Sequence, residues 1–224
     1  AKYDERATTK DADTIKADVI NSLGTYNIST LQRFDSMFRH SKVVKLIDDT
    51  DNSILSNITT LKIRKSFIPT LNSSLKYSVF FRNAVYNPHT GHNSTAGGVV
   101  TSSGFKVQGS NNEQLLDDDG MGNIRRYYLS GATRVYTNST QGTIDYTTGE
   151  ITINSLQITE ISNIRGSAST VIELTVQPAS NDIVPVRDQI LELDIPNSTI
   201  AVQKDSFVGG SSDAGVGYTT TSAY

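Results

Sequence analysis

The sequence predicts an α+β fold, in which helices at the N-terminus precede a mostly antiparallel β-sheet with hairpins. The spacing of apolar residues changes near residue 58, from the about 3.6 residues typical of helices to the two typical of strands. Gly, Ser, Thr and Asn are abundant and Trp is absent, which favours short strands joined by many turns. The chain has 224 residues and no Cys, so its core has to hold the fold without disulfides.

A first helix is predicted over residues 8–23. Either Thr8 or Thr9 can cap its start, and Gly24 can end it. Five apolar residues of this segment fall close to one face of the predicted helix: Ala12, Ile15, Val19, Ile20 and Leu23.

A second helical stretch is predicted to start at Ser29 or Thr30, with an irregularity near His40. Its apolar stripe comprises Leu31, Phe34, Met37 and Phe38, then Val43, Val44, Leu46 and Ile47. Asp48, Asp49 and Asp51 end the pattern. We interpret these acids as solvated side chains that cap the short turn at 53–55, rather than as metal ligands.

Alternation of apolar and polar residues predicts short strands from residue 58 onward. The predicted strands are 61–64, 76–82, 99–101, 105–107, 124–129, 134–136, 143–146, 151–153 and 172–176. The strongest local signal is the hairpin over 142–153, whose tight turn is closed by Gly149. Two more strands are predicted over 191–195 and 200–202, with a turn at 196–198.

These elements predict three regions along the chain. Residues 1–57 form a helical region, and residues 58–207 form a β-rich domain with a long loop at 87–123. Residues 208–224 form a flexible tail rich in Gly, Ser and Thr. The chain begins at Ala1 rather than at Met, so we expect a processed product or a fragment of a longer protein.

Charge and hydropathy argue against nucleic-acid and membrane partners. The net charge is -3 and the densest basic cluster is only Lys62, Arg64 and Lys65, whereas nucleic-acid-binding proteins typically carry a basic stripe. No apolar run approaches the about 18 residues of a spanning helix. We therefore expect no nucleic acid and no membrane as partner.

The sequence has no phosphate-binding loop, no nucleophile elbow and no HExxH motif. His89 and His92 have a metal-like spacing, but they lie in a polar loop without a third ligand in view. The run Asp117–Asp119 lacks the spacing of a calcium loop, so we interpret it as an exposed acidic turn between strands. We therefore expect no enzyme, with no catalytic residue, metal, cofactor or small-molecule substrate.

Several segments together resemble a known family. The block Leu31–Arg39, followed by Lys45–Asp48 and Asp51–Asn57, is similar to the baseplate wedge proteins of T-even-type contractile-tailed phages, in the wider baseplate J-like family. The hairpin residues Asp145–Gly149 and the segment Pro185–Leu191 resemble the C-terminal half of that family. The resemblance runs along most of the chain and rests on packing and turn patterns.

The resemblance implies a structural subunit of a phage tail baseplate wedge. Such proteins dimerise, link wedges into a ring around the hub, contact other wedge subunits and transmit the trigger for sheath contraction. The implied location is the baseplate of a contractile virion tail. The resemblance also implies a late protein, whose assembly takes place in the host cytoplasm. The family's full chain is longer, so this chain would correspond to its C-terminal portion.

If the chain assembles with copies of itself, exposed apolar side chains should mark the interface. We expect partner contacts, in a homodimer or larger homo-oligomer, from five residues: Phe34, Met37, Phe38, Tyr218 and Tyr224. Packing of the first three against the sheet of the same chain explains them equally well.

Two other functions stay open. A receptor- or glycan-binding β-domain of a fibre or adhesin would carry exposed aromatic side chains around Tyr86, His89 and His92. A carbohydrate-active enzyme would need two carboxylates about 5–10 Å apart in a cleft. The absence of Trp argues against a sugar-binding platform.

Overall fold

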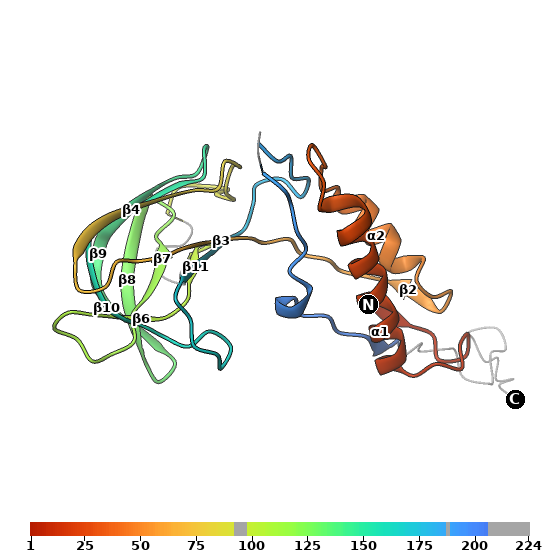
Figure 1. Cartoon of the computed structure of the whole chain (residues 1–224). Coiled ribbons are helices and arrows are strands. Elements are labelled where there is room, and N and C mark those ends of the chain that lie inside the picture. Colours follow the sequence, from red (N-terminus) through yellow and green to blue (C-terminus); the bar gives the residue numbers. More distant parts are fainter. Residues whose placement is uncertain (92–97, 187–188, 206–224) are drawn as a thin grey trace, which may run out of the picture. The chain divides into compact units, whose positions relative to one another are not determined.

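The computed structural model describes residues 1–91, 98–186 and 189–205. The chain divides into two compact units. Unit 1 comprises residues 1–32 and 41–59 with the described residues from 192 onward, and unit 2 comprises residues 33–40 and 60–191. Helices lie in unit 1 and most strands in unit 2 (Figure 1), which confirms the α+β class.

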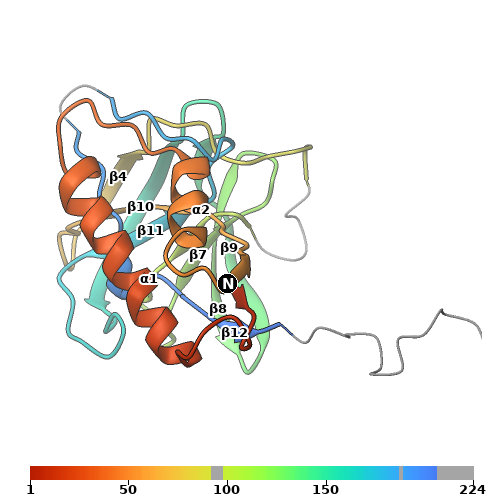
Figure 2. The ribbon, with the colours of Figure 1, turned by 90° about the vertical axis from the view of Figure 1, so that its right-hand side faces the viewer.

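Unit 1 contains two helices that lie side by side (Figures 1 and 2). Helix α1 spans Ala12–Tyr26 and continues into a π-helical turn, Asn27–Leu31, while α2 spans His40–Asp48. The buried residues of α1 are Ile15, Val19 and Leu23, whose four-residue spacing places them on one face. Asp11 caps α1 by accepting a hydrogen bond from the Thr14 N–H at 2.8 Å.

A small sheet completes unit 1. It consists of β1 (Lys2–Tyr3), β2 (Ile54–Ser56) and β12 (Gln203–Lys204), in the order β12-β1-β2. Strand β1 runs parallel to β12 and antiparallel to β2. Pairing between the first and last described segments explains why residues near 203 belong to unit 1.

Unit 2 is built from two sheets. The larger sheet has the order β4-β10-β9-β8-β7, with β6 also paired to β10. Its strands are β4 (Ser74–Phe80), β6 (Phe105–Val107), β7 (Leu115–Asp118), β8 (Asn123–Ser130), β9 (Thr133–Asp145) and β10 (Glu150–Ile161). The smaller sheet has the order β3-β11-β5, formed by Ile63–Phe67, Ile172–Val176 and Thr101–Ser102.

One apolar core, contributed by both sheets, holds unit 2 together. Ile151, Ile153, Ile172 and Leu174 are completely buried in it. Alternate residues of β10 and β11 point into this core, which is the two-residue period that the sequence shows. The hairpin between β9 and β10 turns at Gly149, whose φ of 70° lies in the left-handed region, so the predicted hairpin is confirmed.

Several predicted helix boundaries are wrong. The first helix begins at the cap Asp11 and runs past Gly24, which lies within 3.9 Å of the Ile195 side chain. No helix starts at Ser29 or Thr30; the chain instead forms the π-helical turn and then an irregular segment with Asp35 at a φ of 60°. Local propensity could not reveal these outcomes, because tertiary contacts decide where a helix stops.

The strand predictions also need correction. The strands predicted at 134–136 and 143–146 are parts of the single strand β9. Within the predicted loop region 87–123, the predicted strand 105–107 is confirmed as β6 and the strand predicted at 99–101 overlaps β5, whereas β7 was not predicted. Residues 191–194 do not pair as a strand, and a 3₁₀ helix, Ile195–Asn197, replaces the expected turn.

Candidate interaction surfaces

The acidic run 117–119 lies inside unit 2, so its interpretation as an exposed turn is wrong. Asp117 is completely buried on β7 and accepts hydrogen bonds from Arg125 Nε at 2.9 Å, Arg134 Nη1 at 2.9 Å and the Tyr136 hydroxyl at 2.8 Å. Arg125 also stacks over the Tyr136 ring at 4.3 Å. Burial raises the pKa of Asp117, against the opposing effect of these donors.

Asp118 is also completely buried, and its carboxylate joins two further segments of unit 2. Its oxygens accept hydrogen bonds from the Tyr146 hydroxyl at 2.6 Å and from the Val100 N–H at 2.9 Å. Burial and this carboxylate raise the pKa of Tyr146, so the phenol stays protonated. A Cβ at Gly98 would lie 1.7 Å from an Asp118 oxygen, which shows how tightly the chain packs there.

The third acid, Asp119, organises the turn into β8. Its side chain accepts hydrogen bonds from the N–H groups of Met121 and Asn123 and from the Asn123 amide. Burial alone would raise the pKa of Asp119, but these hydrogen bonds outweigh it and the pKa is lowered. Each of the three carboxylates is therefore occupied by protein donors and organises the fold of unit 2.

This cluster does not have the form of a reactive site. Within the described residues, no group of three or more His, Asp or Glu side chains could hold a metal ion. His89 is exposed, and His92 lies outside the described residues. A carboxylate that already accepts three hydrogen bonds in a buried site has little capacity left to serve as a general base.

Three of the predicted contact residues, Phe34, Met37 and Phe38, lie in a segment of unit 2 that forms an isolated antiparallel β-bridge with Ile183, and we call these two bridged segments the ribbon. The N–H and C=O groups of Phe38 exchange hydrogen bonds with those of Ile183 at 2.9 and 3.0 Å, and Asp182 accepts one from the His40 N–H at 2.9 Å. Because the bridge is antiparallel, Met37 and Val184 are the neighbours of the bridged residues on the same side of it.

The two faces of this ribbon differ in exposure. Phe38 and Ile183 are 5% and 4% exposed, whereas Met37 and Val184 are 37% and 54% exposed. Successive residues of a strand point to opposite faces, so Met37 and Val184 form an apolar pair directed to solvent. Phe34 is 72% exposed on the same segment. We call Phe34, Met37 and Val184 the ribbon patch.

The five predicted contact residues are therefore not equivalent. Phe34 and Met37 are available to a partner, while Phe38 is buried within its own chain, the alternative that the sequence had left open. Tyr218 and Tyr224 lie outside the described residues. Val184 has no signal in the sequence, because only the bridge between Phe38 and Ile183 brings it near Met37.

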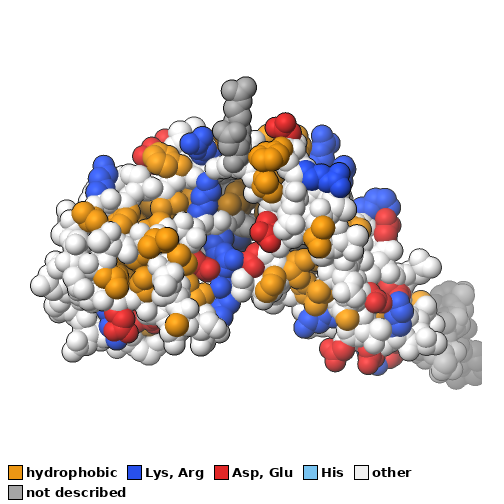
Figure 3. All heavy atoms as spheres, in the orientation of Figure 1, with side chains coloured by type: hydrophobic (Ala, Val, Ile, Leu, Met, Phe, Trp, Pro, Cys, Tyr) orange, Lys and Arg blue, Asp and Glu red, His pale blue; other side chains and the backbone are white. Residues whose placement is uncertain are grey.

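A second exposed apolar region follows the β3–β4 connection of unit 2. Ile68, Leu71 and Leu75 are 75%, 44% and 41% exposed, and Phe80 at the far end of β4 is 45% exposed. Hydrophobic side chains are visible at the surface of unit 2 in the space-filling view (Figure 3). β4 ends its sheet and pairs with β10 alone among the described strands.

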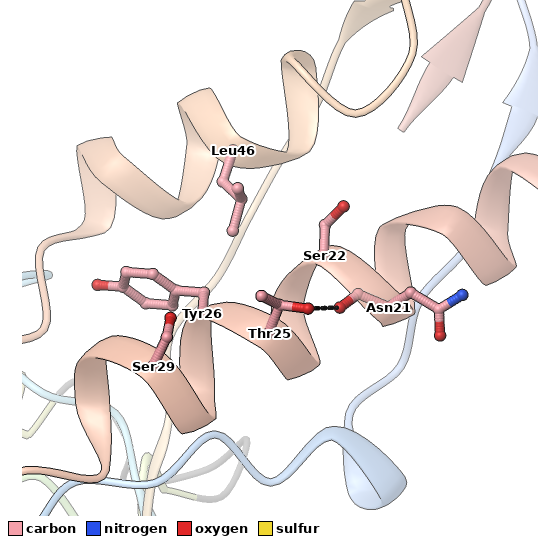
Figure 4. A pocket seen from close by; sticks show the side chains of 6 residues that line it. All are labelled: Asn21, Ser22, Thr25, Tyr26, Ser29 and Leu46. Carbon is pink, nitrogen blue, oxygen red and sulfur yellow. Dashed lines mark hydrogen bonds between the residues drawn. The ribbon is translucent and has the colours of Figure 1, made fainter.

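Unit 1 has a shallow hollow between its helices (Figure 4). Its volume is about 420 Å³, and it is lined by Asn21, Ser22, Thr25, Tyr26, Ser29 and Leu46. Leu46 of α2 points toward α1, and the Thr25 hydroxyl donates to the Asn21 carbonyl at 3.0 Å. The lining residues include no His, Asp, Glu, Lys or Arg.

The aromatic cluster expected of a glycan-binding domain gains no clear support. Tyr86 is 39% exposed and His89 is exposed, while His92 lies outside the described residues. Across those same residues, no helix combines the length and hydropathy needed to cross a membrane.

Comparison with known proteins gives one finding. Residues 1–66 match the family model described as baseplate structural protein gp6, C-terminal domain III. The match supports a structural role in a phage baseplate. It covers both helices, β1, β2 and most of β3, whereas the resemblance over 145–149 and 185–191 lies beyond it. No curated protein matches the chain.

Proposed function

We propose that the chain is a structural subunit of a phage baseplate wedge, which links wedges into a ring around the hub and passes on the trigger for sheath contraction. The family match over residues 1–66 carries this proposal. The match supports a structural role in a phage baseplate, and the T-even-type wedge role is the more specific reading that the resemblance implies.

Two properties of unit 2 support a role in assembly. Its buried acids are occupied by Arg and Tyr side chains, so they stabilise a rigid body. The ribbon patch exposes three apolar side chains next to a buried pair, which is what an obligate partner would cover. We propose this patch as a contact with a sister subunit in a homodimer.

An electron-microscopy reconstruction of the parent tail tests the function directly. We expect density for this chain in a ring around the hub, in contact with other wedge subunits. An interface of an obligate assembly should bury on the order of 2,000 Å² or more. Density at the tip of a fibre, away from the ring, would favour the receptor-binding alternative instead.

The ribbon patch can be tested separately with the double variant Met37→Asp and Val184→Asp. We expect a folded chain that no longer self-associates, because two carboxylates would be desolvated at the contact. Leu129→Asp is a matched control, since Leu129 is 53% exposed on β8 and outside the patch. Equal self-association of the double variant and the wild type would exclude this surface.

A further inference from the structure

Strand β4 presents a free edge that is suited to pair with another strand. The Phe81 N–H donates to the Gly149 carbonyl at 2.9 Å, and Val79 is opposite Ile151 in the register with β10. Because hydrogen bonding alternates along an antiparallel pair, the backbone groups of Lys76, Ser78 and Phe80 point away from β10. Strands with such unpaired groups are templates for pairing with another chain.

The core is also incompletely covered beside this edge. Phe67 of β3 and Tyr77 of β4 are partly buried against the core, with ring centroids 4.9 Å apart. Leu75, on the same face of β4 as Tyr77, is 41% exposed. An added strand with apolar residues on this face would cover Leu75 and Tyr77.

The charges around the edge are basic. Lys65 Nζ donates to the outward Phe80 carbonyl at 2.6 Å. Desolvation, and then the charge of Arg82, lower the pKa of Lys65. Lys65, Lys76 and Arg82 take part in no ion pair within residues 1–91, 98–186 and 189–205. A strand that carries carboxylates would therefore match this edge.

The segment Leu191-Glu192-Leu193-Asp194-Ile195 has this pattern. Apolar residues alternate with acids, as in a strand with one buried face, yet the segment pairs with no strand in the described structure. Leu191, Leu193 and Ile195 are only half-buried. The Leu193 N–H donates to Asn27 at 2.8 Å, and the backbone groups of Glu192 point the opposite way where the chain is extended. The chain turns at Asp194, where the Leu193 carbonyl accepts from the Ile195 N–H at 2.9 Å and Asn197 donates to the Asp194 carboxylate at 2.6 Å, so strand addition has to straighten this turn.

We propose that the segment 191–194 of a second copy of this chain adds to β4 as an antiparallel strand, with Leu193 opposite Tyr77. This inference rests on the proposed role in assembly and names a second contact, separate from the ribbon patch. Glu192 is then opposite Ser78, as a hydrogen-bonded pair that uses the outward groups of both residues.

The two faces of the added strand fit in this register. Leu191 and Leu193 lie on the core face, opposite Val79 and Tyr77. Asp194 lies on the outer face opposite Lys76, with Glu192 on the diagonal. Opposite charges at these cross-strand positions are stabilising. A shift by one residue would direct both acids to the core face, so the pattern specifies the register.

Engineered disulfides test the proposal in the full chain, which has no Cys of its own. Ser78→Cys and Glu192→Cys chains are mixed and oxidised mildly. Directly opposite residues have Cα atoms about 5.5 Å apart, within disulfide range. We expect a mixed dimer from this pair. The matched control pairs Ser78→Cys with Leu193→Cys, whose side chains would lie on opposite faces, and should cross-link at least about tenfold less.

Ser78→Pro provides an independent variant. It removes an N–H that points away from β10, so a free edge tolerates it while strand addition is blocked. We expect cross-linking between Asp194→Cys and a Ser78→Pro chain that carries Lys76→Cys to be lost, whereas Lys76→Cys without the proline should still cross-link with Asp194→Cys. If Ser78→Pro fails to fold, a charge exchange replaces it. Lys76→Glu alone and Asp194→Lys alone should each weaken dimer formation, and the chain that carries both substitutions should dimerise as the wild type does.

The outcomes separate this inference from the proposed function. A chain that dimerises but shows equal cross-linking in the Ser78–Glu192 and Ser78–Leu193 pairs would overturn the strand addition and leave the assembly role intact. A chain that stays monomeric in every mixture would overturn both.

Discussion

Two acidic runs look alike in the sequence and have opposite roles in the structure. In unit 1, the Asp49 side chain is 57% exposed and pairs with Lys45, whereas the Asp51 side chain is 11% exposed and pairs with Lys10. Asp117 and Asp118 of unit 2 are completely buried. A run of acids in a sequence therefore does not by itself indicate a solvated turn. Its environment depends on residues distant in the sequence, which strand pairing places beside it.

The number of residues between each acid and its hydrogen-bond donors explains why only the first run could be interpreted correctly from the sequence. Asp51 accepts hydrogen bonds from the N–H and hydroxyl of Ser53, two residues away, so it caps the turn as predicted. Asp117 binds Arg134 and Tyr136, which are 17 and 19 residues away. Local pattern shows the first kind of contact and cannot show the second.

The largest expected effect is that of Asp117→Ala. The substitution leaves the Arg125 side chain, only 8% exposed, without its partner carboxylate. Breaking a buried pair in this way costs about 3–5 kcal/mol. Urea denaturation of the whole chain, followed by a probe in unit 2, measures the change in the free energy of unfolding.

Asp49→Ala is the matched surface variant for this comparison. Its i,i+4 pair with Lys45 is exposed and should contribute about 0.3–0.5 kcal/mol. Similar losses in the two variants would mean that the buried cluster does not stabilise unit 2, and the contrast between the runs would fail.

Tyr146→Phe sharpens the comparison at the second buried acid. The variant keeps the ring but removes the hydroxyl that donates to Asp118 at 2.6 Å. A buried acceptor that loses its donor costs about 1–3 kcal/mol. Tyr128→Phe on β8 is the control. Thermal unfolding should show a clear decrease for the first variant and almost none for the second.

An effect smaller than at either buried acid is expected in the first run, for Asp51→Ala. Hydrogen bonds from Ser53, and then the interaction with Lys10, lower the pKa of Asp51 to about 2. We expect the loss of this turn cap to cost about 1 kcal/mol at neutral pH. Chemical denaturation, followed by a probe in unit 1, measures it.

The effect of Asp51 should depend on pH in a defined direction. A carboxyl whose folded pKa is below its unfolded value stabilises the fold fully above the unfolded pKa, near 3.8, and this contribution is lost as the pH falls through about 2. The stability difference between wild type and Asp51→Ala should therefore decrease from pH 5 to pH 2. A difference that grows over this range would contradict the assignment.

Much of the fold was predictable because period and turn chemistry are local. The α+β class, the hairpin at Gly149 and the strand near Leu174 follow directly from apolar spacing. The π-helical turn at Asn27 and the late start of α2 did not, since tertiary packing overrides helix propensity. The pairing of β12 with β1 joins residues about 200 positions apart and has no local signal.

The candidate contact surfaces were predictable only in part. Phe34 and Met37 stood out as apolar residues, but burial of Phe38 depends on its pairing with Ile183. The alternation over 191–195 was visible in the sequence, yet the strand it predicts has no partner in the described chain. A segment that pairs with the sheet of a second molecule would show this combination, namely a strand pattern in the sequence and no partner strand in its own chain.

Sedimentation equilibrium of the full wild-type chain, over a concentration series that reaches high micromolar, tests the central claim most directly. That claim is that the exposed apolar surfaces of unit 2 serve contact between copies. We predict an apparent mass that rises above the 24.4 kDa of one chain as the concentration increases. A mass of 24.4 kDa at every concentration would contradict it.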